Sequence, residues 1–453
     1  MSREFWKELN ARFRPDEPAL QQAWRVARPY SPVDDIIKGL ARPFEPDQKR
    51  YLLYGTTGAG KTTELLRVGD ARTKDTFVVF FDVGRHFDGV GDPAALDHLQ
   101  PWEVVFLCGL AVVRAAREVL GHQWDAEELN ALSKAATALM SGGETASLDV
   151  AKLASSVLVL AGGALGAAAA GPIGAAAGAA VLKTVGAVVE DASGLVKAAK
   201  WNIPLGGRGR REFVQDQDAR AKNLLAAVNK LLGTLQVEYG PVTFILDGLD
   251  RIKDPATTER VFIESRLLGA LVCATVVTGS ATLVGRGLPR TSFDAYMLHS
   301  VPVMRQDALG DPAQADESVE CFVKAYNART ADLEDSSRRV SQPLLRRLGY
   351  FSGGRFRDFV RFIRDLAGEC WDDDTDAATE EQANKVLDRW RKMYEEGLDA
   401  DRIALLRSAR DTHKLPGGSE GLELVTNLWL LPYPNGTKWW APHPLLLMGT
   451  TLE

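Results

Sequence analysis

The sequence has little cysteine and little histidine, 4 and 6 residues of 453. Its cysteines are scattered and show no metal-ligand spacing, which excludes the usual zinc sites and a disulfide framework. Such a pattern fits reduced thiols in the cytosol. The start of the chain, Met1 to Pro18, is charged and polar rather than apolar, so it predicts no secretory signal peptide. We therefore expect a cytoplasmic protein, with these cysteines in its core: Cys108, Cys273, Cys321 and Cys370.

The sequence also lacks an excess of positive charge. It carries 54 Lys and Arg against 60 Asp and Glu, which gives a net charge of −6 and a pI near 5.7. A dedicated nucleic-acid-binding domain is normally strongly basic, so this balance argues against that class. The length predicts a multidomain protein of about two to four domains.

A glycine-rich stretch carries the strongest functional signal. It lies between an apolar run, Tyr51–Tyr54, and a helical run that begins at Thr63. Strand, loop and helix in this order predict a phosphate-binding loop, whose main-chain N–H groups turn inward around a phosphate. Lys61 then reaches the β- and γ-phosphate oxygens, and Thr62 is a ligand for Mg²⁺. The predicted nucleotide-binding residues are Gly55, Thr56, Thr57, Gly58, Ala59, Gly60, Lys61, Thr62 and Thr63.

A second motif supplies the metal-orienting carboxylate that such a loop requires. The apolar run Val242–Leu246 reads as a strand buried on both faces and ends in Asp247-Gly248-Leu249-Asp250. We predict that Asp247 holds Mg²⁺. Asp250 polarises the attacking water or holds a residue that does. Alone, Asp247-Gly248 also fits a simple strand-ending turn.

Three more runs of β-forming residues alternate with helical stretches: Thr76–Val83, Ala274–Gly279 and Tyr296–Val301. This alternation predicts an α/β fold, with a parallel sheet, helices on both faces, and the ligand at the carboxyl ends of the strands. Thr278 and Ser280 end the fourth strand, where a hydroxyl can sense the γ-phosphate. The alternative is that both hydroxyls only cap the next helix.

Together these motifs resemble the AAA+/STAND branch of P-loop NTPases, close to NACHT-type and origin-initiator-like ATPases. The resemblance implies a helical lid with an arginine that touches ATP. Ser352-Gly353-Gly354-Arg355-Phe356-Arg357-Asp358 opens an amphipathic helix and matches that lid motif. Arg357 is the expected lid arginine and Arg355 the alternative, and a surface arginine on a capped helix stays open. Adenine is implied by the family, since no Asn-Lys-x-Asp motif for guanine is present.

The C-terminal region resembles a winged-helix module. It reads as two short helices, 402–413 and 419–427, followed by a hairpin, in which the runs 428–431 and 437–440 flank Asn435-Gly436. Such a module can bind DNA. However, the tryptophans of this hairpin suit packing better than insertion into a groove, so DNA contact is the less favoured interpretation: Trp429, Trp439 and Trp440.

The sequence departs from the family pattern in the residue after Asp250. The family has a glutamate there, whereas this chain has Arg251. Hydrolysis is then slow, or Glu64 or a partner supplies the missing carboxylate. Arg286 and Arg290 lie where AAA+ rings place an arginine that acts on a neighbouring subunit. They read equally as exposed loop charges.

An uncharged stretch rich in alanine and glycine, Leu153–Leu182, is the most unusual segment. It is long enough to span a bilayer, and Gly162/Gly166 and Gly174/Gly178 have the spacing of closely packed membrane helices. Gly171-Pro172 instead predicts a break between two short helices. A packing insert, conditional membrane contact and a permanent anchor all stay open.

These features predict four regions: an N-terminal helical segment (1–30), a P-loop NTPase domain (31–305), a helical lid (306–398) and a winged-helix-like domain (399–453). An insert occupies about 122–212 of the second region. The N-terminal helix carries an apolar stripe that docks on the ATPase body or on a partner: Phe5, Trp6, Leu9 and Phe13.

The function expected from the resemblance is an ATP-binding and ATP-hydrolysing switch that uses ATP and Mg²⁺. It acts in signalling or bacterial defence through a conformational change, a homo-oligomer or a partner protein. Contact of 153–182 with a membrane on activation is part of this expectation. The alternative is a DNA-binding, initiator-like ATPase with a winged helix.

Overall fold

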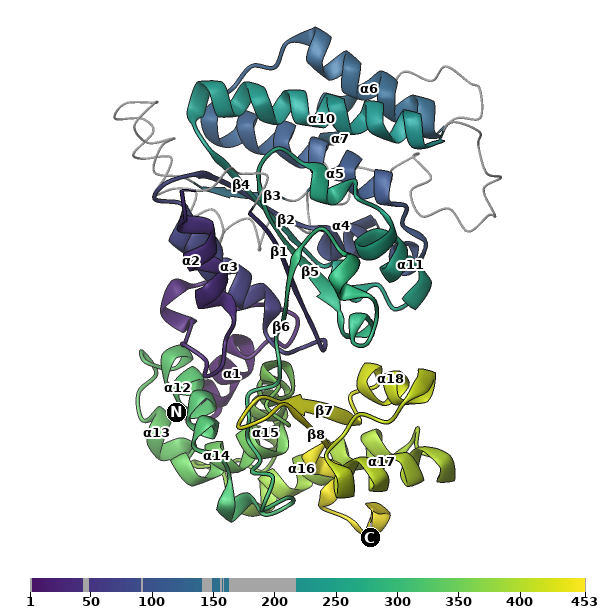
Figure 1. The fold of residues 1–453 in the computed structure, drawn as a ribbon. Coiled ribbons are helices and arrows are strands. Elements are labelled where there is room, and N and C mark those ends of the chain that lie inside the picture. Colours follow the sequence, from purple (N-terminus) through teal and green to yellow (C-terminus); the bar gives the residue numbers. More distant parts are fainter. Residues whose placement is uncertain are drawn as a thin grey trace. The chain divides into compact units, whose positions relative to one another are not determined.

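The computed structural model describes residues 2–43, 49–90, 93–140, 149–154, 157, 159–162 and 217–452. It falls into two compact units (Figure 1). Unit 1 consists of Met1–Pro32, Gly55–Thr63 and Met297–Glu453, and unit 2 of Val33–Tyr54 and Glu64–Tyr296. The units do not follow the order of the chain. The phosphate-binding loop is grouped with the N-terminal segment and the last third of the chain.

Unit 2 is built around a six-stranded sheet in the order β3-β2-β4-β5-β1-β6. Five strands are parallel, and β3 is antiparallel to its neighbour β2. The predicted α/β class is therefore confirmed. Strand β6 starts two residues earlier than predicted and ends at Met297. The strands are β1 (Arg50–Gly55), β2 (Phe77–Asp82), β3 (Val159–Gly162), β4 (Val242–Asp247), β5 (Ala274–Ser280) and β6 (Asp294–Met297).

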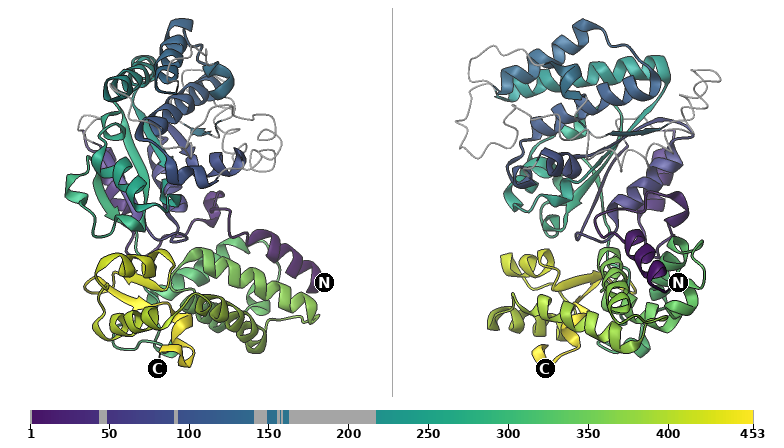
Figure 2. Two further views of the ribbon diagram at one scale, coloured as in Figure 1. Left: turned by 90° about the vertical axis from the view of Figure 1, so that its right-hand side faces the viewer. Right: turned by 180° about the vertical axis from the view of Figure 1, so that it is seen from behind.

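The strands at the centre of the sheet are apolar along their whole length because helices cover them. Every residue of β4 and of β5 is buried. Helix α5 packs on β2 and on α10, and α6 packs on α10 (Figure 2). The helices of this unit are α2 (Val33–Ala41), α3 (Lys61–Arg72), α4 (Val83–Val90), α5 (Pro101–Ala115), α6 (Ala126–Met140), α7 (Val150–Ala154), α10 (Gln217–Tyr239) and α11 (Pro255–Glu259).

Part of the uncharged stretch forms a strand and not a helix. Residues 159–162 pair with Val78–Phe81 at the edge of the sheet, so the predicted helix is wrong there. Gly162 cannot form a helical pair with Gly166. Residues 159–162 were difficult to assign because a short apolar run fits a buried strand as well as a helix. Residues 163–182, with Gly171-Pro172 and Gly174/Gly178, lie outside the described residues.

No helix within the described ranges is long and apolar enough to cross a membrane.

Unit 1 combines the predicted lid with the N-terminal helix. The apolar stripe of α1 (Ser2–Arg12) lies along α15, and Trp6 donates from Nε1 to the Thr375 carbonyl at 2.8 Å (Figure 2). The partner of this stripe is therefore the lid of the same chain. The lid helices are α12 (Glu320–Arg329), α13 (Ser336–Arg339), α14 (Gln342–Phe351), α15 (Phe356–Asp372) and α16 (Glu380–Glu395).

The C-terminal region has the predicted order of two helices and a hairpin: α17 (Ala400–Thr412), α18 (Gly418–Thr426), β7 (Leu430–Tyr433) and β8 (Trp439–Pro442). Both strands start two residues later than predicted. Its tryptophans are buried, as expected for packing. Trp429 donates to the Tyr394 carbonyl at 2.8 Å, and Trp439 to Asn435 Oδ1 at 2.9 Å.

Candidate nucleotide-binding site

The phosphate-binding loop joins the end of β1 to the start of α3, as the sequence predicts. Gly58 and Gly60 have φ angles of 82° and 99°, a region that favours glycine. A β-carbon at Gly58 would lie 2.9 Å from Nη2 of Arg355, so the loop leaves no room for a side chain there. Thr62 and Thr63 fall in the first turn of α3, where N–H groups point toward an anion.

Lys61 folds back onto the loop. Its Nζ donates to the carbonyls of Gly55 at 2.9 Å and Thr56 at 2.8 Å. The lysine is 4% exposed, so its charge is held inside the turn and not in solvent. A bound phosphate would meet a cation that is already in place.

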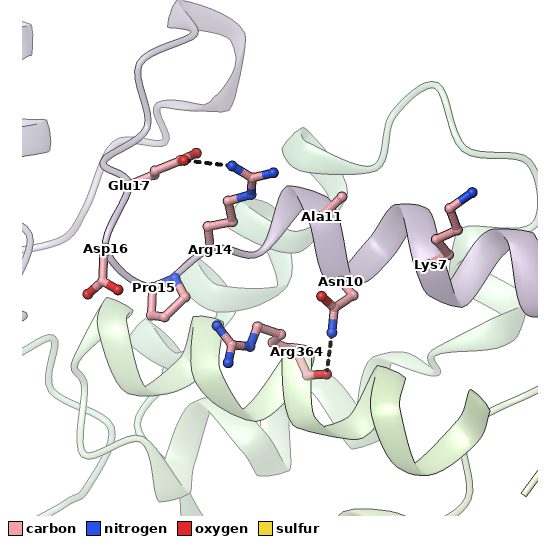
Figure 3. Close-up of a pocket in the computed structure, with 8 residues that line it drawn as sticks. All are labelled: Lys7, Asn10, Ala11, Arg14, Pro15, Asp16, Glu17 and Arg364. Atoms are coloured by element: carbon pink, nitrogen blue, oxygen red, sulfur yellow. Dashed lines mark hydrogen bonds and ion pairs between the residues drawn. The ribbon is translucent and has the colours of Figure 1, made fainter. Parts of the chain in front are cut away.

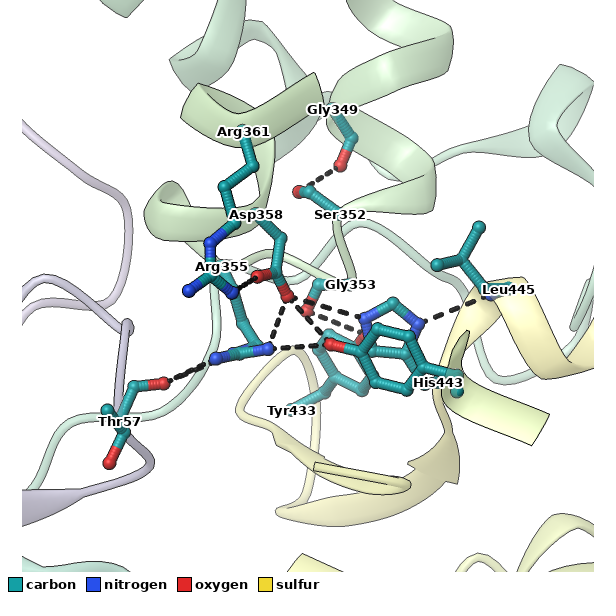
Figure 4. A network of polar contacts seen from close by, with 11 residues as sticks. Thr57, Gly349, Ser352, Gly353, Arg355, Asp358, Arg361, Tyr433, His443 and Leu445 are labelled. Carbon is teal, nitrogen blue, oxygen red and sulfur yellow. Dashed lines mark hydrogen bonds and ion pairs between the residues drawn. The ribbon is translucent and has the colours of Figure 1, made fainter. Parts of the chain in front are cut away.

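The lid supplies a second cation. Arg355, the N-cap residue of α15, donates from Nε and Nη2 to the Thr57 carbonyl at 3.2 and 2.7 Å. Its Nη1 pairs with Asp358 and donates to Tyr394 Oη at 2.8 Å (Figure 4). Arg357 contacts the loop through its main chain, because its N–H donates to the Gly58 carbonyl at 3.3 Å. The guanidinium of Arg355, the alternative lid arginine, therefore contacts the loop. The choice of Arg357 as the arginine that touches ATP stays a prediction.

This network continues into the C-terminal hairpin. Tyr394 donates to Asp358 at 2.9 Å and stacks on His443 with 4.3 Å between ring centroids. His443 is fully buried, and its Nδ1 accepts from the Leu445 N–H at 3.3 Å. Burial lowers the pKa of His443 to about 3, although Asp358 opposes this shift. The ring is therefore neutral at pH 7 and acts as a cap.

A third cation, Arg28, was not identified from the sequence. It is 7% exposed, and Nη1 donates to the Ala59 carbonyl at 2.5 Å while Nη2 donates to the His299 carbonyl at 2.5 Å. Its guanidinium lies 5.9 Å from the centroid of the Phe356 ring. Arg28 belongs to a stretch without regular periodicity or a known motif, so no sequence signal pointed to it.

The predicted acidic residues lie at the end of β4 in unit 2. Asp247 is 2% exposed, and its Oδ1 accepts from the Gly248 N–H at 2.8 Å. Asp250 follows in a short 3₁₀-helix, Leu249–Arg251, and is half-buried. Both stand where the sequence predicted them, one ending the strand and one in the turn.

Arg251, which replaces the family's glutamate, forms an ion pair with Asp88 of α4. Asp82, the last residue of β2, is the register partner of Asp247. Burial raises the pKa of Asp82, and the Arg85 N–H and the Arg251 charge oppose this shift. An arginine thus occupies a position where the resemblance implies a carboxylate.

The two hydroxyls at the end of β5 have different surroundings. Ser280 Oγ accepts from the Thr282 N–H at 3.2 Å, so it caps the following turn, as the alternative had it. Thr278 Oγ1 is buried and has no hydrogen-bond partner among the residues that the structure describes. A buried hydroxyl without a partner is uncommon and calls for a ligand or a water.

The remaining candidates are engaged elsewhere in unit 2. Glu64, proposed as a substitute carboxylate, is buried and accepts from Arg67 at 2.8 Å. Arg286 pairs with Glu259 at 3.3 Å, whereas Arg290 is exposed.

These residues fit ATP with Mg²⁺. A glycine loop with positive φ angles precedes a helix N-terminus, Lys61 is placed in the turn, and a buried carboxylate ends a strand of the same parallel sheet. Mg²⁺ keeps several waters and needs only one or two protein ligands. Thr62 in unit 1 and Asp247 in unit 2 each carry an oxygen of the kind that it prefers. No group of three or more possible metal ligands is found in the described part of the chain.

A separate surface pocket of unit 1 contains none of the loop residues (Figure 3). Its polar groups bond to one another: Arg14 pairs with Glu17 at 3.1 Å, and Asn10 donates to the Arg364 carbonyl at 3.4 Å. We assign it no role.

Comparisons with known proteins give structural neighbours only. No family model matches the sequence, and no curated protein matches it. Three similar solved structures are Cdc6p from Pyrobaculum aerophilum, the Aeropyrum pernix ORC1 protein in complex with DNA, and the Aeropyrum pernix ORC2 protein in ADPNP–ADP complexes.

Their sequence identities are 12, 12 and 13%, and their TM-scores 0.37, 0.37 and 0.36. The matches cover 98, 98 and 94% of this chain and 96, 95 and 95% of the others. At these values the sites and partners of the three proteins do not carry over to this chain.

Proposed function

We propose that the protein is a P-loop ATPase of AAA+ type that works as a nucleotide-dependent switch. The observation that carries this proposal is the loop itself, in which Lys61 and the lid residue Arg355 both donate to loop carbonyls within one unit. A nucleotide that enters this loop changes the surroundings of a lid side chain. Nucleotide state and lid position are thereby linked.

Each residue has a distinct role in the proposed mechanism. The loop N–H groups and Lys61 bind the phosphates, while Thr62 and Asp247 hold Mg²⁺, which supplies charge neutralisation when bound. Asp250 orients the attacking water. Thr278, whose buried hydroxyl lacks a partner among the described residues, detects the γ-phosphate.

The switch requires unequal contacts with ATP and ADP. A ligand shifts a conformational equilibrium only by its difference in affinity for the two states. We propose that a lid arginine, Arg355 or Arg357, provides this difference. Hydrolysis is slow because Arg251 stands in place of the glutamate, which makes a long-lived ATP state possible.

A binding experiment tests the proposal. Isothermal titration calorimetry with ATP, ADP and GTP should show Mg²⁺-dependent binding of the adenine nucleotides to the wild type. Lys61→Ala should weaken it strongly. Equal heats for wild type and Lys61→Ala would contradict nucleotide binding by this loop.

ATP-dependent assembly and a role in signalling or defence belong to the same proposal. Light scattering with ADP and with ATP would show whether ATP changes the mass. Liposomes in the same experiment test membrane contact by residues 153–182, of which the structure describes only seven, among them the edge strand Val159–Gly162.

One observation favours the second candidate, a DNA-binding initiator-like ATPase: the C-terminal order of two helices and a hairpin. Charge disfavours it, because residues 399–453 hold five Lys and Arg against six Asp and Glu. Helix α18 carries Glu420 and Glu423 and no basic residue. Fluorescence anisotropy with duplex DNA at two salt concentrations decides, since phosphate contacts give affinity that falls steeply with salt.

A further inference from the structure

Two carbonyls of the phosphate-binding loop accept hydrogen bonds from arginine side chains. Arg28 holds the carbonyl of Ala59, and Arg355 holds that of Thr57. In a planar trans peptide, the C=O of one residue and the N–H of the next point in opposite directions. A side chain that fixes the Ala59 carbonyl therefore also fixes the direction of the Gly60 N–H.

We propose that Arg28 is a positioning residue for the phosphate-binding loop. It holds the Ala59 carbonyl from the outer side so that the Gly60 N–H faces the phosphate on the inner side. This inference rests on the proposed nucleotide binding. It assigns a role to the N-terminal segment, which lies outside both the loop motif and the lid motif.

The geometry of Arg28 suits orientation of the loop more than contact with a phosphate. Both Nη atoms already donate to main-chain carbonyls, one in the loop and one at His299. A planar guanidinium with two such bonds has a defined orientation, and the Phe356 ring lies 5.9 Å from its Cζ. A β-carbon at Gly60 would lie 3.8 Å from Nη1, so the arginine packs directly on the turn.

The charge of Arg28 also strengthens the N–H that it orients. A cation on a carbonyl oxygen polarises the amide, and polarised hydrogen bonds in a chain reinforce one another. The Gly60 N–H then becomes a better donor to an anion. Without Arg28, the glycine peptide, whose φ of 99° only the turn maintains, is free to rotate.

This mechanism predicts a pattern across nucleotides. Loop N–H groups cradle the α- and β-phosphates, which ATP and ADP share. Loss of Arg28 should therefore weaken ATP and ADP by the same factor and leave adenosine unaffected. A residue that binds the γ-phosphate directly would weaken ATP alone.

The test compares Arg28→Gln, Arg28→Lys and the control Arg25→Gln by calorimetry with ATP, ADP and adenosine. Arg25 lies three residues away and donates to the Ala19 and Leu20 carbonyls, not to the loop. We expect Arg28→Gln to weaken ATP and ADP each about tenfold, or about 1.4 kcal/mol. Arg28→Lys should restore part of the loss, since an ammonium can still reach one carbonyl. Arg25→Gln should bind like the wild type.

Three results would overturn the proposal. If Arg28→Gln loses affinity for ATP alone, Arg28 is a ligand of the γ-phosphate. If it loses the same affinity for adenosine, the substitution damages the protein generally. If it binds ATP and ADP like the wild type, Arg28 has no role in nucleotide binding. If Arg28→Gln does not fold, Arg28→Lys decides, because the proposal requires equal factors for ATP and ADP there too. Lys61→Ala, measured alongside, separates the two levels: if it binds ATP normally, the proposed function fails whatever Arg28 does.

Discussion

The phosphate-binding loop and the end of β4 are both recognisable motifs, but they differ in how far their surroundings follow the motif. In the loop, Lys61, Arg28 and Arg355 all donate to main-chain carbonyls. At the end of β4, the carboxylate of Asp247 is in place, yet Arg251 replaces the expected glutamate and pairs with Asp88. This difference is the reason for proposing slow hydrolysis: the loop keeps its lysine and two arginines, whereas the end of β4 lacks the expected glutamate.

Removal of one charged side chain should have a larger effect beside the phosphate-binding loop than at the end of β4. Arg355→Ala takes from the buried Asp358 its fully buried guanidinium partner and leaves it only the half-buried Arg361, at 3.4 Å, and Tyr394. Breaking a buried pair typically costs about 3–5 kcal/mol. We expect a large fall in melting temperature by calorimetry. Arg364→Ala is the control, since Arg364 is an exposed arginine of the same helix and its replacement should melt close to the wild type. Similar melting temperatures for both variants would show that the Arg355–Asp358 pair does not stabilise the folded protein.

On the β4 side, Asp247→Asn should separate binding from hydrolysis. The amide keeps the size of the side chain and an oxygen toward the Gly248 N–H, but loses the charge that Mg²⁺ needs. We expect ATP turnover to fall roughly 100-fold, about 2.7 kcal/mol, with nucleotide binding largely retained. A phosphate-release assay beside calorimetry measures both. Unchanged turnover would place the Mg²⁺ carboxylate elsewhere.

Low pH should weaken the network that adjoins the loop. The pKa of His443 is about 3 in the folded protein, against an ordinary value of 6.5 in the unfolded chain. A lowered pKa contributes stability above pH 6.5 that is lost as the pH falls toward 3. At pH 5 the loss is about 2 kcal/mol.

Urea unfolding at pH 7.5 and pH 5 checks this expectation. His443→Asn is the control, because asparagine keeps an acceptor for the Leu445 N–H but does not titrate. The wild type should lose more stability between the two pH values than the variant. Parallel curves would mean that His443 is not protonated on unfolding.

The smallest effect should come from a glutamate at position 251, the residue that the resemblance implies there. Arg251→Glu should raise ATP turnover by about tenfold if this position can orient the attacking water. Arg251→Gln, which also breaks the pair with Asp88 but adds no carboxylate, is its control. Equal rates for both variants would show that a carboxylate at position 251 does not orient the attacking water.

The sequence sufficed for the parts of the fold with a local signature. Apolar runs predicted β1, β2, β4 and β5, and an apolar stripe predicted the N-terminal helix α1. The glycine loop and Asp247 were identified because their spacing alone has a physical meaning. The C-terminal hairpin was predicted from Asn435-Gly436, although its strands lie two residues further on.

Other features depend on contacts between distant parts of the chain and had no local signature. Helix α5 is buried at all positions but Arg114, so it shows no amphipathic period. Arg28 gains its place only because residues near 28, 59 and 299 meet. The choice between Arg355 and Arg357 likewise depended on which side of the α15 N-terminus faces the loop.

The composition of the units has a consequence for biosynthesis. Unit 2 consists of residues up to Tyr296, whereas unit 1 joins α1 and the loop to Met297–Glu453. During translation, which proceeds at roughly 5–20 residues per second, the residues of unit 2 are all synthesised before the lid exists. The apolar stripe of α1 can pack on α15 only after α15 has been synthesised. The Thr57 carbonyl likewise gains its hydrogen bond only after Arg355 has been synthesised. The newly made chain therefore completes its nucleotide-binding loop last, although that loop is among the first segments to leave the ribosome.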